Sequence, residues 1–392
     1  MPIPSSGNLG RRNCIPILYT KGTHYEVGYD VGRTFSGLIQ NFLEEAESTP
    51  GYLGEYLEAY NTPEGQKGYE DTLNCLKTNF PQYVDELKGT AEGANVPFYK
   101  LFLLHMDNII LSAAEKKLID HPTGCSTICI NEKGQELLGH TEDALALTLN
   151  YYYFVSAHII TDKPQGKWGV KEEKFTSLCY AGHLPGYTMS YNHHGLVFSI
   201  NTLVAKNLKT GKTPRHFITR ALLSAENFAQ AQQILRDRGC GAGDGCSINM
   251  TFIKQEGDRL FHNVEMGPAT AKEAESQLNI LTVSPGECSF HTNSYLRMKL
   301  EEPDNKKMFE SSVARMETFR KYKPPKNEED LKQMLSDRTH VNGIDVFRDA
   351  KTDYVKTIAV GIFNITEKTW SLYSDSPRQN DPLVVLPLQL KK

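Results

Sequence analysis

Apolar residues recur at helical spacing through the first third of the chain. Between residues 24 and 48, six of them follow one another at intervals of three or four: Val27, Val31, Phe35, Leu38, Phe42 and Ala46. This spacing predicts one amphipathic helix whose apolar stripe faces the protein core. The segments 66–79, 81–94 and 98–114 continue the same signal. The first ~120 residues are therefore predicted to be largely helical.

After Cys125 the pattern changes to short runs of β-branched and aromatic residues, broken by Gly, Pro and Asn. Such runs predict a sheet built from hairpins, and the stretch 131–134 (NEKG) has the composition of a hairpin turn. Two pairs of helices are predicted, at 214–224 and 227–238 and at 306–322 and 327–337. Strands at 247–254, 259–266, 278–284, 354–365 and 369–375 complete the pattern. Sheets covered by helices, in an α+β or α/β layered domain, fit this order.

Composition and charge exclude several classes of protein. The chain has 43 basic and 47 acidic residues, so it offers no basic field to hold a nucleic acid. No apolar run approaches the ~18 residues of a membrane span, and the first residues contain no apolar core of a secretion signal. The eight cysteines are scattered and form no CxxC pair, which predicts free thiols and no zinc site. We therefore expect a cytoplasmic protein without a metal or other cofactor, a nucleic-acid partner or a membrane contact.

The change of pattern falls at one peptide bond, Gly124–Cys125, in the segment HPTGCSTICIN. An N-terminal cysteine supplies a thiol nucleophile and its own α-amino group as the base, since free α-amino groups titrate near ~7.7–8.0. Such a residue must be produced by cleavage of the bond before it. Gly124 has no Cβ to hinder attack of the thiol on its carbonyl, and it tolerates a strained backbone. A buried strand cysteine is the alternative interpretation.

Several motifs resemble those of one family. The segment KGTHYEVGYDVGRTFSGLI (21–39) resembles the start of the isopenicillin-N acyltransferase family, and TGCST resembles its self-cleavage site. GQELLGHTED (134–143) is similar to the strand that follows that site. Four segments occur downstream in matching order: GLVFSINTL (195–203), VEMGP (264–268), FHTNSYL (290–296) and VGIFNI (360–365). The resemblance implies an α+β fold, the αββα sandwich of N-terminal-nucleophile hydrolases, preceded by a largely helical segment.

The resemblance also implies that the precursor cuts itself between Gly124 and Cys125. Residues 1–124 would form a helical α subunit, and residues 125–392 a β subunit with the nucleophile at its start. The two fragments are expected to stay associated, as they do in that family.

The resemblance assigns roles to individual side chains. Cys125 matches the nucleophile, Asn293 matches the amide that donates to the oxyanion, and Asp143 matches an aspartate that orients the nucleophile and its amine. Three more residues match positions near the family's site: Thr127, Glu265 and Thr357. A family arginine that follows the Thr357 position is replaced here by Ile358, so the resemblance gives no basis for a substrate-anion contact there.

Two other polar residues each allow two interpretations. Asn201 is either a site residue or the end of a strand. Glu142, beside Asp143, is either a solvated strand residue or a carboxylate that seats a cationic amine of the substrate. His291 is interpreted as structural, because this mechanism needs no histidine base.

The family's chemistry implies an amidohydrolase. Acyl transfer to Cys125 releases an amine, and water then hydrolyses the thioester. The chain length and the segments TGCST and GHTED resemble family members that cleave N-β-alanyl amines, so small molecules such as β-alanyl-dopamine and carcinine (β-alanyl-histamine) are the expected substrates. The alternative is an acyl-CoA-dependent N-acyltransferase of the same fold, in which a second amine or thiol replaces water. A third hypothesis is an uncleaved binding protein with an inactive site, which would run as one band on a denaturing gel.

Overall fold

Seven helices precede Cys125 in the computed structural model, which describes residues 10–11, 13–119, 124–270, 272–303, 306–341, 343–351 and 353–391. They are α1 (His24–Thr34), α2 (Ser36–Ser48), α3 (Leu53–Tyr60), α4 (Pro63–Asn79), α5 (Pro81–Ala94), α6 (Phe98–Met106) and α7 (Asn108–Ala113). Thr23 and Glu26 start α1 with a capping box, in which each side chain accepts a hydrogen bond from the other residue's backbone N–H. Proline occupies the first turn of α4 and of α5, where its missing N–H costs nothing.

Two segments that were predicted as single helices are broken in the structure. The helix over 24–48 is interrupted at Phe35, and the helix over 98–114 is interrupted at Asp107. Asp107 has φ 50° and ψ −133°, a backbone conformation that cannot continue a helix. The sequence pattern revealed neither break, and it also missed α3.

The larger sheet has eight strands in the order β1-β4-β5-β6-β7-β8-β9-β10. They are β1 (Ile17–Gly22), β4 (Tyr152–Gln165), β5 (Val170–Tyr180), β6 (Met189–Asn192), β7 (Leu196–Leu203), β8 (Gly245–Phe252), β9 (Phe261–Gly267) and β10 (Gln277–Val283). β1 pairs in parallel with β4, and the remaining neighbours are antiparallel. The N-terminal segment therefore contributes an edge strand to this sheet as well as its helices, which the sequence did not predict.

The smaller sheet has six strands in the order β11-β2-β3-β12-β13-β14. They are β2 (Gly124–Glu132), β3 (Gln135–Leu145), β11 (Cys288–His291), β12 (Val355–Asn364), β13 (Thr369–Tyr373) and β14 (Val384–Pro387). β2 and β3 form the predicted hairpin around Lys133 and Gly134. Gly134 has φ 78°, a left-handed conformation that glycine adopts without a steric penalty. The hairpin places the first residues of β2 beside the last residues of β3.

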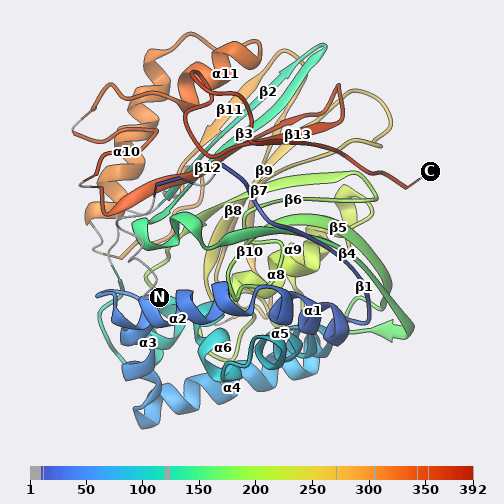
Figure 1. Cartoon of the computed structure of the whole chain (residues 1–392), viewed down its shortest axis with the longest axis vertical. Coiled ribbons are helices and arrows are strands. Elements are labelled where there is room, and N and C mark those ends of the chain that lie inside the picture. The colour runs from blue at the N-terminus through green and yellow to red at the C-terminus, as the bar shows by residue number, and fades with distance from the viewer. Residues whose placement is uncertain are drawn as a thin grey trace.

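The two sheets lie face to face, with helices on both outer sides (Figure 1). One apolar cluster joins the larger sheet to the N-terminal helices and to α8 (Arg215–Leu222) and α9 (Phe228–Arg236). A second cluster fills the space between the sheets, and a third packs α10 (Lys306–Lys321) and α11 (Glu328–Leu335) on the smaller sheet. This αββα order confirms the predicted fold class. No helix within the described residues has the length and apolar character that a membrane crossing needs.

Candidate active site

Cys125 is the second residue of β2, and its side chain is buried, with 5% of the residue exposed. In the hairpin it lies opposite Glu142, and Gly124 lies opposite Asp143. These four residues line a cavity of about 150 Å³ that also borders on residues of the N-terminal helical segment. The hairpin register therefore brings one thiol and two carboxylates to the same cavity.

Gly124 lies where no larger residue fits. A Cβ on this residue would come within 2.1 Å of Asn293 Oδ1 and within 2.5 Å of Arg315 Nη2. Both side chains are buried and hydrogen-bonded to each other, so they have little freedom to move aside. Thr123, which precedes Gly124 in the TGCST motif, lies outside the described residues.

We expect Gly124→Ala to slow any cleavage of the Gly124–Cys125 bond by about 10²-fold, because a displacement of roughly 1 Å at a reacting group has effects of this size. The rate is measured as the appearance of the shorter fragments by intact-protein mass spectrometry. Gly37→Ala is the matched control, since a Cβ at Gly37 meets no atom within 4 Å. Equal cleavage rates in the two variants would contradict the steric argument.

Three polar side chains hold the backbone of Cys125. Its N–H donates to Asn293 Oδ1 at 2.8 Å, and its carbonyl oxygen accepts from Asn201 Nδ2 at 3.0 Å and from Arg315 Nη1 at 2.6 Å. Arg315, on α10, also donates from Nη2 to Asn293 Oδ1 at 2.8 Å. Burial and, after it, the neighbouring Arg348 lower the pKa of Arg315 to about 10, so the guanidinium is still charged at neutral pH. The sequence did not single out Arg315.

The amide of Asn293 is oriented by its neighbours. Its oxygen faces two donors, the Cys125 N–H and the Arg315 guanidinium, while its Nδ2 donates to the Thr202 carbonyl at 2.9 Å. In this arrangement Asn293 holds the nitrogen of the Gly124–Cys125 bond. One N–H of Nδ2 is engaged with Thr202, so donation to an oxyanion would use the second N–H. The oxyanion role of Asn293 therefore stays a prediction.

Asn201 lies near the end of β7 and is part of a fully buried polar network. Its Oδ1 accepts from the Thr127 hydroxyl at 2.9 Å and from Asn249 Nδ2 at 2.8 Å, while its Nδ2 reaches Cys125. The Thr127 hydroxyl also lies 2.7 Å from His140 Nδ1. Asn201 thus holds the Cys125 carbonyl directly, Thr127 acts through Asn201, and neither is among the residues that line the cavity.

Glu142 is buried at the site, so the interpretation of it as a solvated strand residue is wrong. Its Oε1 accepts from the Tyr180 hydroxyl at 2.6 Å, and its Oε2 lies 3.1 Å from His140 Nε2. The Cys125 thiol donates to Oε1 at 3.8 Å, a length expected for sulfur. Burial, followed by the charges of Glu142 and Asp143, raises the pKa of Cys125 well above its usual value. The thiol is therefore protonated in the uncut chain and needs a base.

Asp143 has one oxygen engaged and one free for a further partner. Oδ1 accepts from the Thr357 hydroxyl at 2.6 Å, and the Thr357 oxygen in turn accepts from the Arg348 backbone N–H at 2.9 Å. Oδ2 is buried and has no hydrogen-bond partner among the described residues. Burial raises the pKa of Asp143, although Arg348, Arg315 and the Thr357 hydroxyl oppose the shift. A cationic amine beside this oxygen would satisfy it.

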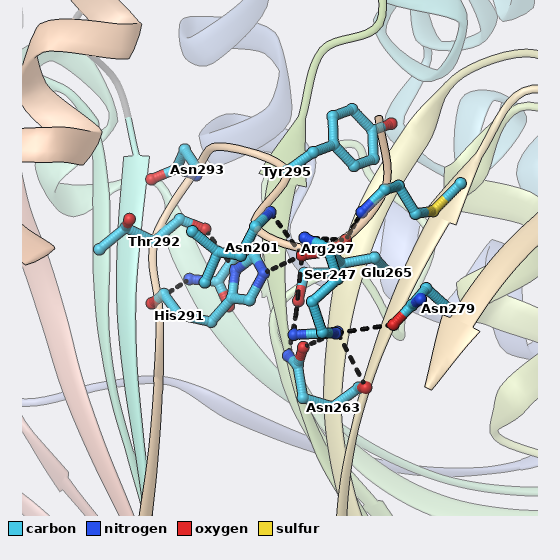
Figure 2. Close-up of polar contacts among 12 residues, drawn as sticks. Asn201, Ser247, Asn263, Glu265, Asn279, His291, Thr292, Asn293, Tyr295 and Arg297 are labelled. Carbon is cyan, nitrogen blue, oxygen red and sulfur yellow. Dashed lines mark hydrogen bonds and ion pairs between the residues drawn. The ribbon is translucent and has the colours of Figure 1, made fainter. Parts of the chain in front are cut away.

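Glu265 acts at a distance from the cavity, by fixing the segment that carries Asn293 (Figure 2). On β9, it accepts from the backbone N–H groups of Leu296 at 2.7 Å and Met298 at 2.8 Å, and it lies 3.2 Å from His291 Nε2. Burial acts to raise the pKa of Glu265, but these hydrogen bonds outweigh it and lower the pKa to about 2. Glu265 is therefore a charged anchor, and His291 is held between it and the Thr292 carbonyl.

The cavity is also lined by a group of aromatic and imidazole rings that the sequence did not single out, called the ring wall below: Tyr52, Tyr56, His183, Tyr187 and His216. Asp107 adds a third carboxylate to the lining; it accepts from the Tyr56 hydroxyl at 2.6 Å and pairs with Arg215. The break between α6 and α7 brings this carboxylate to the cavity. Burial lowers the pKa of His183 to about 4, so this ring is neutral at pH 7.

One group of three possible metal ligands comes together within the part of the chain that the structure describes. Cys125, His140 and Glu142 each place a ligand atom within 4.8 Å of the others. These are the thiol, ring and carboxylate whose mutual hydrogen bonds hold the site, and those bonds account for the cluster. We therefore assign the group no metal.

The comparison with known families identifies the family of this chain. Residues 130–379, more than half of the chain, match the model of the acyl-coenzyme A:6-aminopenicillanic acid acyl-transferase family. The chain belongs to this family. Membership of the acyl-transferase family confirms the resemblance that the sequence motifs indicated.

Two individual proteins are also similar. The beta-alanyl-dopamine/carcinine hydrolase of Drosophila melanogaster is 54% identical over 395 residues, which covers 99% of this chain and 100% of that protein. A crystal structure of a mutant conjugated bile acid hydrolase from Clostridium perfringens aligns with a TM-score of 0.38 and 9% identity, over 69% of this chain and 99% of that one. Of these two, the Drosophila protein is the one that is similar over the full length of this chain.

Proposed function

We propose that the chain is a self-processing amidohydrolase that releases aromatic amines from N-β-alanyl amines through a thioester on Cys125. The observation that carries the proposal is the 54% identity, over 99% of the chain, to a beta-alanyl-dopamine/carcinine hydrolase. The site supports it with a buried thiol that directly follows a tightly packed glycine and has two carboxylates beside it.

Maturation begins in the uncut chain. The Cys125 thiol adds to the Gly124 carbonyl carbon, the bond to the Cys125 nitrogen breaks, and that nitrogen takes up a proton. Glu142 is the proposed acceptor of the thiol proton, because the thiol already donates to it. Asn293 Oδ1 holds the departing nitrogen, and Arg315 orients the Asn293 amide. Water then hydrolyses the thioester, which leaves a Gly124 carboxylate and a free Cys125 with an α-amino group.

Catalysis repeats the same chemistry on a substrate. The freed α-amino group, with an ordinary pKa near ~7.7–8.0, accepts the thiol proton as sulfur adds to the amide carbonyl. The amine leaves with that proton, and the β-alanyl group stays on Cys125. Water then releases β-alanine. This scheme requires no histidine base, and His291 is engaged with Glu265.

The cavity suits the two ends of such a substrate. The carboxylates of Glu142 and Asp143 lie beside Cys125, where the ammonium of a bound β-alanyl group would lie, and Asp143 Oδ2 lacks a partner among the described residues. The ring wall formed by Tyr52, Tyr56, His183, Tyr187 and His216 provides flat surfaces for the aromatic ring of the amine. Because Tyr52 and Tyr56 come from the N-terminal fragment, both fragments would contribute to the substrate site.

The proposal is tested by incubating the purified chain with β-alanyl-dopamine and with carcinine, followed by chromatography with mass detection. Equimolar release of β-alanine and the free amine is expected. N-Acetyl-dopamine, which lacks the ammonium, is the matched control and should be cleaved poorly. If fully processed protein releases no amine from either β-alanyl substrate, the proposed hydrolase activity is wrong.

Acyl transfer is the second candidate, because the matching family model describes an acyl-coenzyme A-dependent acyl-transferase. It would share the thioester and differ only in the molecule that accepts the acyl group. Supplying an acyl-CoA with dopamine and measuring the new amide distinguishes the two activities.

The free thiols fit a reducing compartment, so we place the enzyme in the cytoplasm. The distribution of a tagged chain would test this location.

We expect Glu142→Gln to lower kcat/KM for β-alanyl-dopamine by about 10- to 100-fold, since a charged hydrogen bond contributes roughly 1.5–3 kcal/mol. The neutral analogue propionyl-dopamine should lose much less. Glu136→Gln, on the same strand but away from the cavity, is the control. Rates are taken per processed molecule, so that slow maturation does not mimic poor binding. Equal losses on both substrates would leave the ammonium without Glu142 as its partner.

A further inference from the structure

Two cysteines far apart in the sequence lie almost in bonding contact. Cys75 Sγ and Cys240 Sγ are 2.8 Å apart, although 165 positions separate the residues. A disulfide bond is ~2.05 Å long, so a small displacement would close the gap. Cys75 lies on α4, and Cys240 follows the C-terminal end of α9. This pair is separate from the cavity that contains Cys125.

The surroundings of the two sulfur atoms differ. Cys240 is buried and has the Thr213 hydroxyl 3.4 Å from its sulfur, whereas Cys75 is partly exposed and has Asn79 Nδ2 at 3.6 Å. The hydrogen bond from Cys75, opposed by burial, lowers the pKa of Cys240 to about 7. The same hydrogen bond raises the pKa of Cys75. Cys240 is therefore the more acidic thiol of the pair and the one more readily ionised, and oxidation to a disulfide starts from a thiolate beside a second thiol.

We propose that Cys75 and Cys240 are an oxidation site, at which a hydroperoxide converts the two thiols into a disulfide. The Cys240 thiolate attacks the peroxide, forms a sulfenic acid and releases water or an alcohol. The Cys75 thiol then attacks the sulfenic sulfur and displaces water. With hydrogen peroxide the balance is two thiols oxidised by two electrons and one peroxide reduced to two waters.

The disulfide would join chain segments on opposite sides of the Gly124–Cys125 bond. In a processed enzyme it would tie the N-terminal fragment covalently to the C-terminal fragment, and in an uncut chain it would close a large loop. The contact between Cys75 and Cys240 does not depend on cleavage of the Gly124–Cys125 bond. It can therefore be examined in a full chain in which Cys125 is replaced, where neither maturation nor active-site oxidation interferes.

The experiment treats full-length Cys125→Ala protein with hydrogen peroxide, alkylates the remaining thiols, and maps unreduced peptides by mass spectrometry. A peptide that links Cys75 to Cys240 is expected, with the loss of two hydrogen atoms. The unfolding midpoint should rise by roughly 5 °C, as disulfides that close long loops do. Cys75→Ser and Cys240→Ser should each abolish the linked peptide, whereas Cys14→Ser, at an exposed thiol, should retain it.

The proposal is wrong if peptide mapping recovers Cys75 and Cys240 in separate peptides, each alkylated or oxidised, under conditions that oxidise Cys14. That result would show that the two residues do not form a disulfide. A link from either residue to a different cysteine would also reject it. In wild-type protein, a disulfide is detected by peptide mapping whether or not the chain has been cut, so a failure of this proposal is distinct from a failure of the proposed maturation.

Discussion

Cys125→Ala is expected to leave the chain as one piece of 392 residues without hydrolase activity, whereas the unaltered chain should be cut into pieces of 124 and 268 residues. The reason is that one sulfur atom would serve both reactions. Without it, neither the Gly124 carbonyl nor a substrate amide has a nucleophile, and the expected loss of rate is about 10⁶-fold, as when a covalent nucleophile is removed from other hydrolases. Intact-protein mass spectrometry and an amine-release assay measure the two losses.

Cys129→Ala is the matched control for this prediction. Cys129 is a second buried thiol on β2, but it packs in the apolar cluster between the sheets. Its replacement should cost some stability and leave both cleavage and turnover in place. If active wild-type enzyme still has Cys125 joined to Gly124, or if Cys125→Ala is cut at the usual rate, Cys125 is not the self-cleaving nucleophile.

Asn293→Ala should lower kcat for β-alanyl-dopamine by about 10²- to 10³-fold, with much less effect on KM, because the lost hydrogen bond strengthens in the transition state. Turnover must be expressed per processed molecule, since Asn293 also holds the nitrogen of the bond that is cut. A fully processed Asn293→Ala enzyme with wild-type kcat would remove Asn293 from the catalytic step.

Asn293→Asp separates the two possible contributions of this side chain. Aspartate keeps an oxygen that can accept from the Cys125 nitrogen and from Arg315, but it has no N–H to donate. If Asn293 donates to the oxyanion, the processed aspartate variant should be as slow as the alanine variant. Recovery of kcat in Asn293→Asp would instead assign Asn293 the role of positioning the amine of Cys125.

The sequence predicted those parts of the fold that local periodicity encodes. The helices over 81–94 and 227–238 and the hairpin that begins at Cys125 were found because apolar spacing or turn composition marks them. β1 was missed for two reasons. Its residues ILYTKG alternate between exposed and partly exposed positions, which gives a weak strand signal, and its partner strand β4 lies far along the chain. The break at Asp107 was missed because the positive φ of this residue is a property of the folded backbone that the spacing of apolar residues does not encode.

The candidate site was only partly predictable for the same reason. Residues in family motifs could be placed near Cys125, and the structure does bring Asn293, Asp143, Glu142 and Asn201 to it. Arg315 lies in a helix outside those motifs. Its one signal in the sequence is a charged residue close to three small residues, Ser311, Ser312 and Ala314, which the structure shows to be buried. The ring wall could not be predicted, since its members come from segments that meet only through tertiary packing.

The parallel pairing of β1 with β4 has a consequence for how a cut enzyme would respond to dilution. Two separately folded subunits dissociate at low concentration by mass action. Here a six-residue strand of the first piece completes the edge of a sheet that belongs to the second, with Ile17 opposite Phe154 and Gly22 opposite Ile159. Release of the first piece would require this strand to be peeled from the sheet. The cut enzyme should therefore behave like a nicked single protein, whose specific activity is the same at nanomolar as at micromolar concentration.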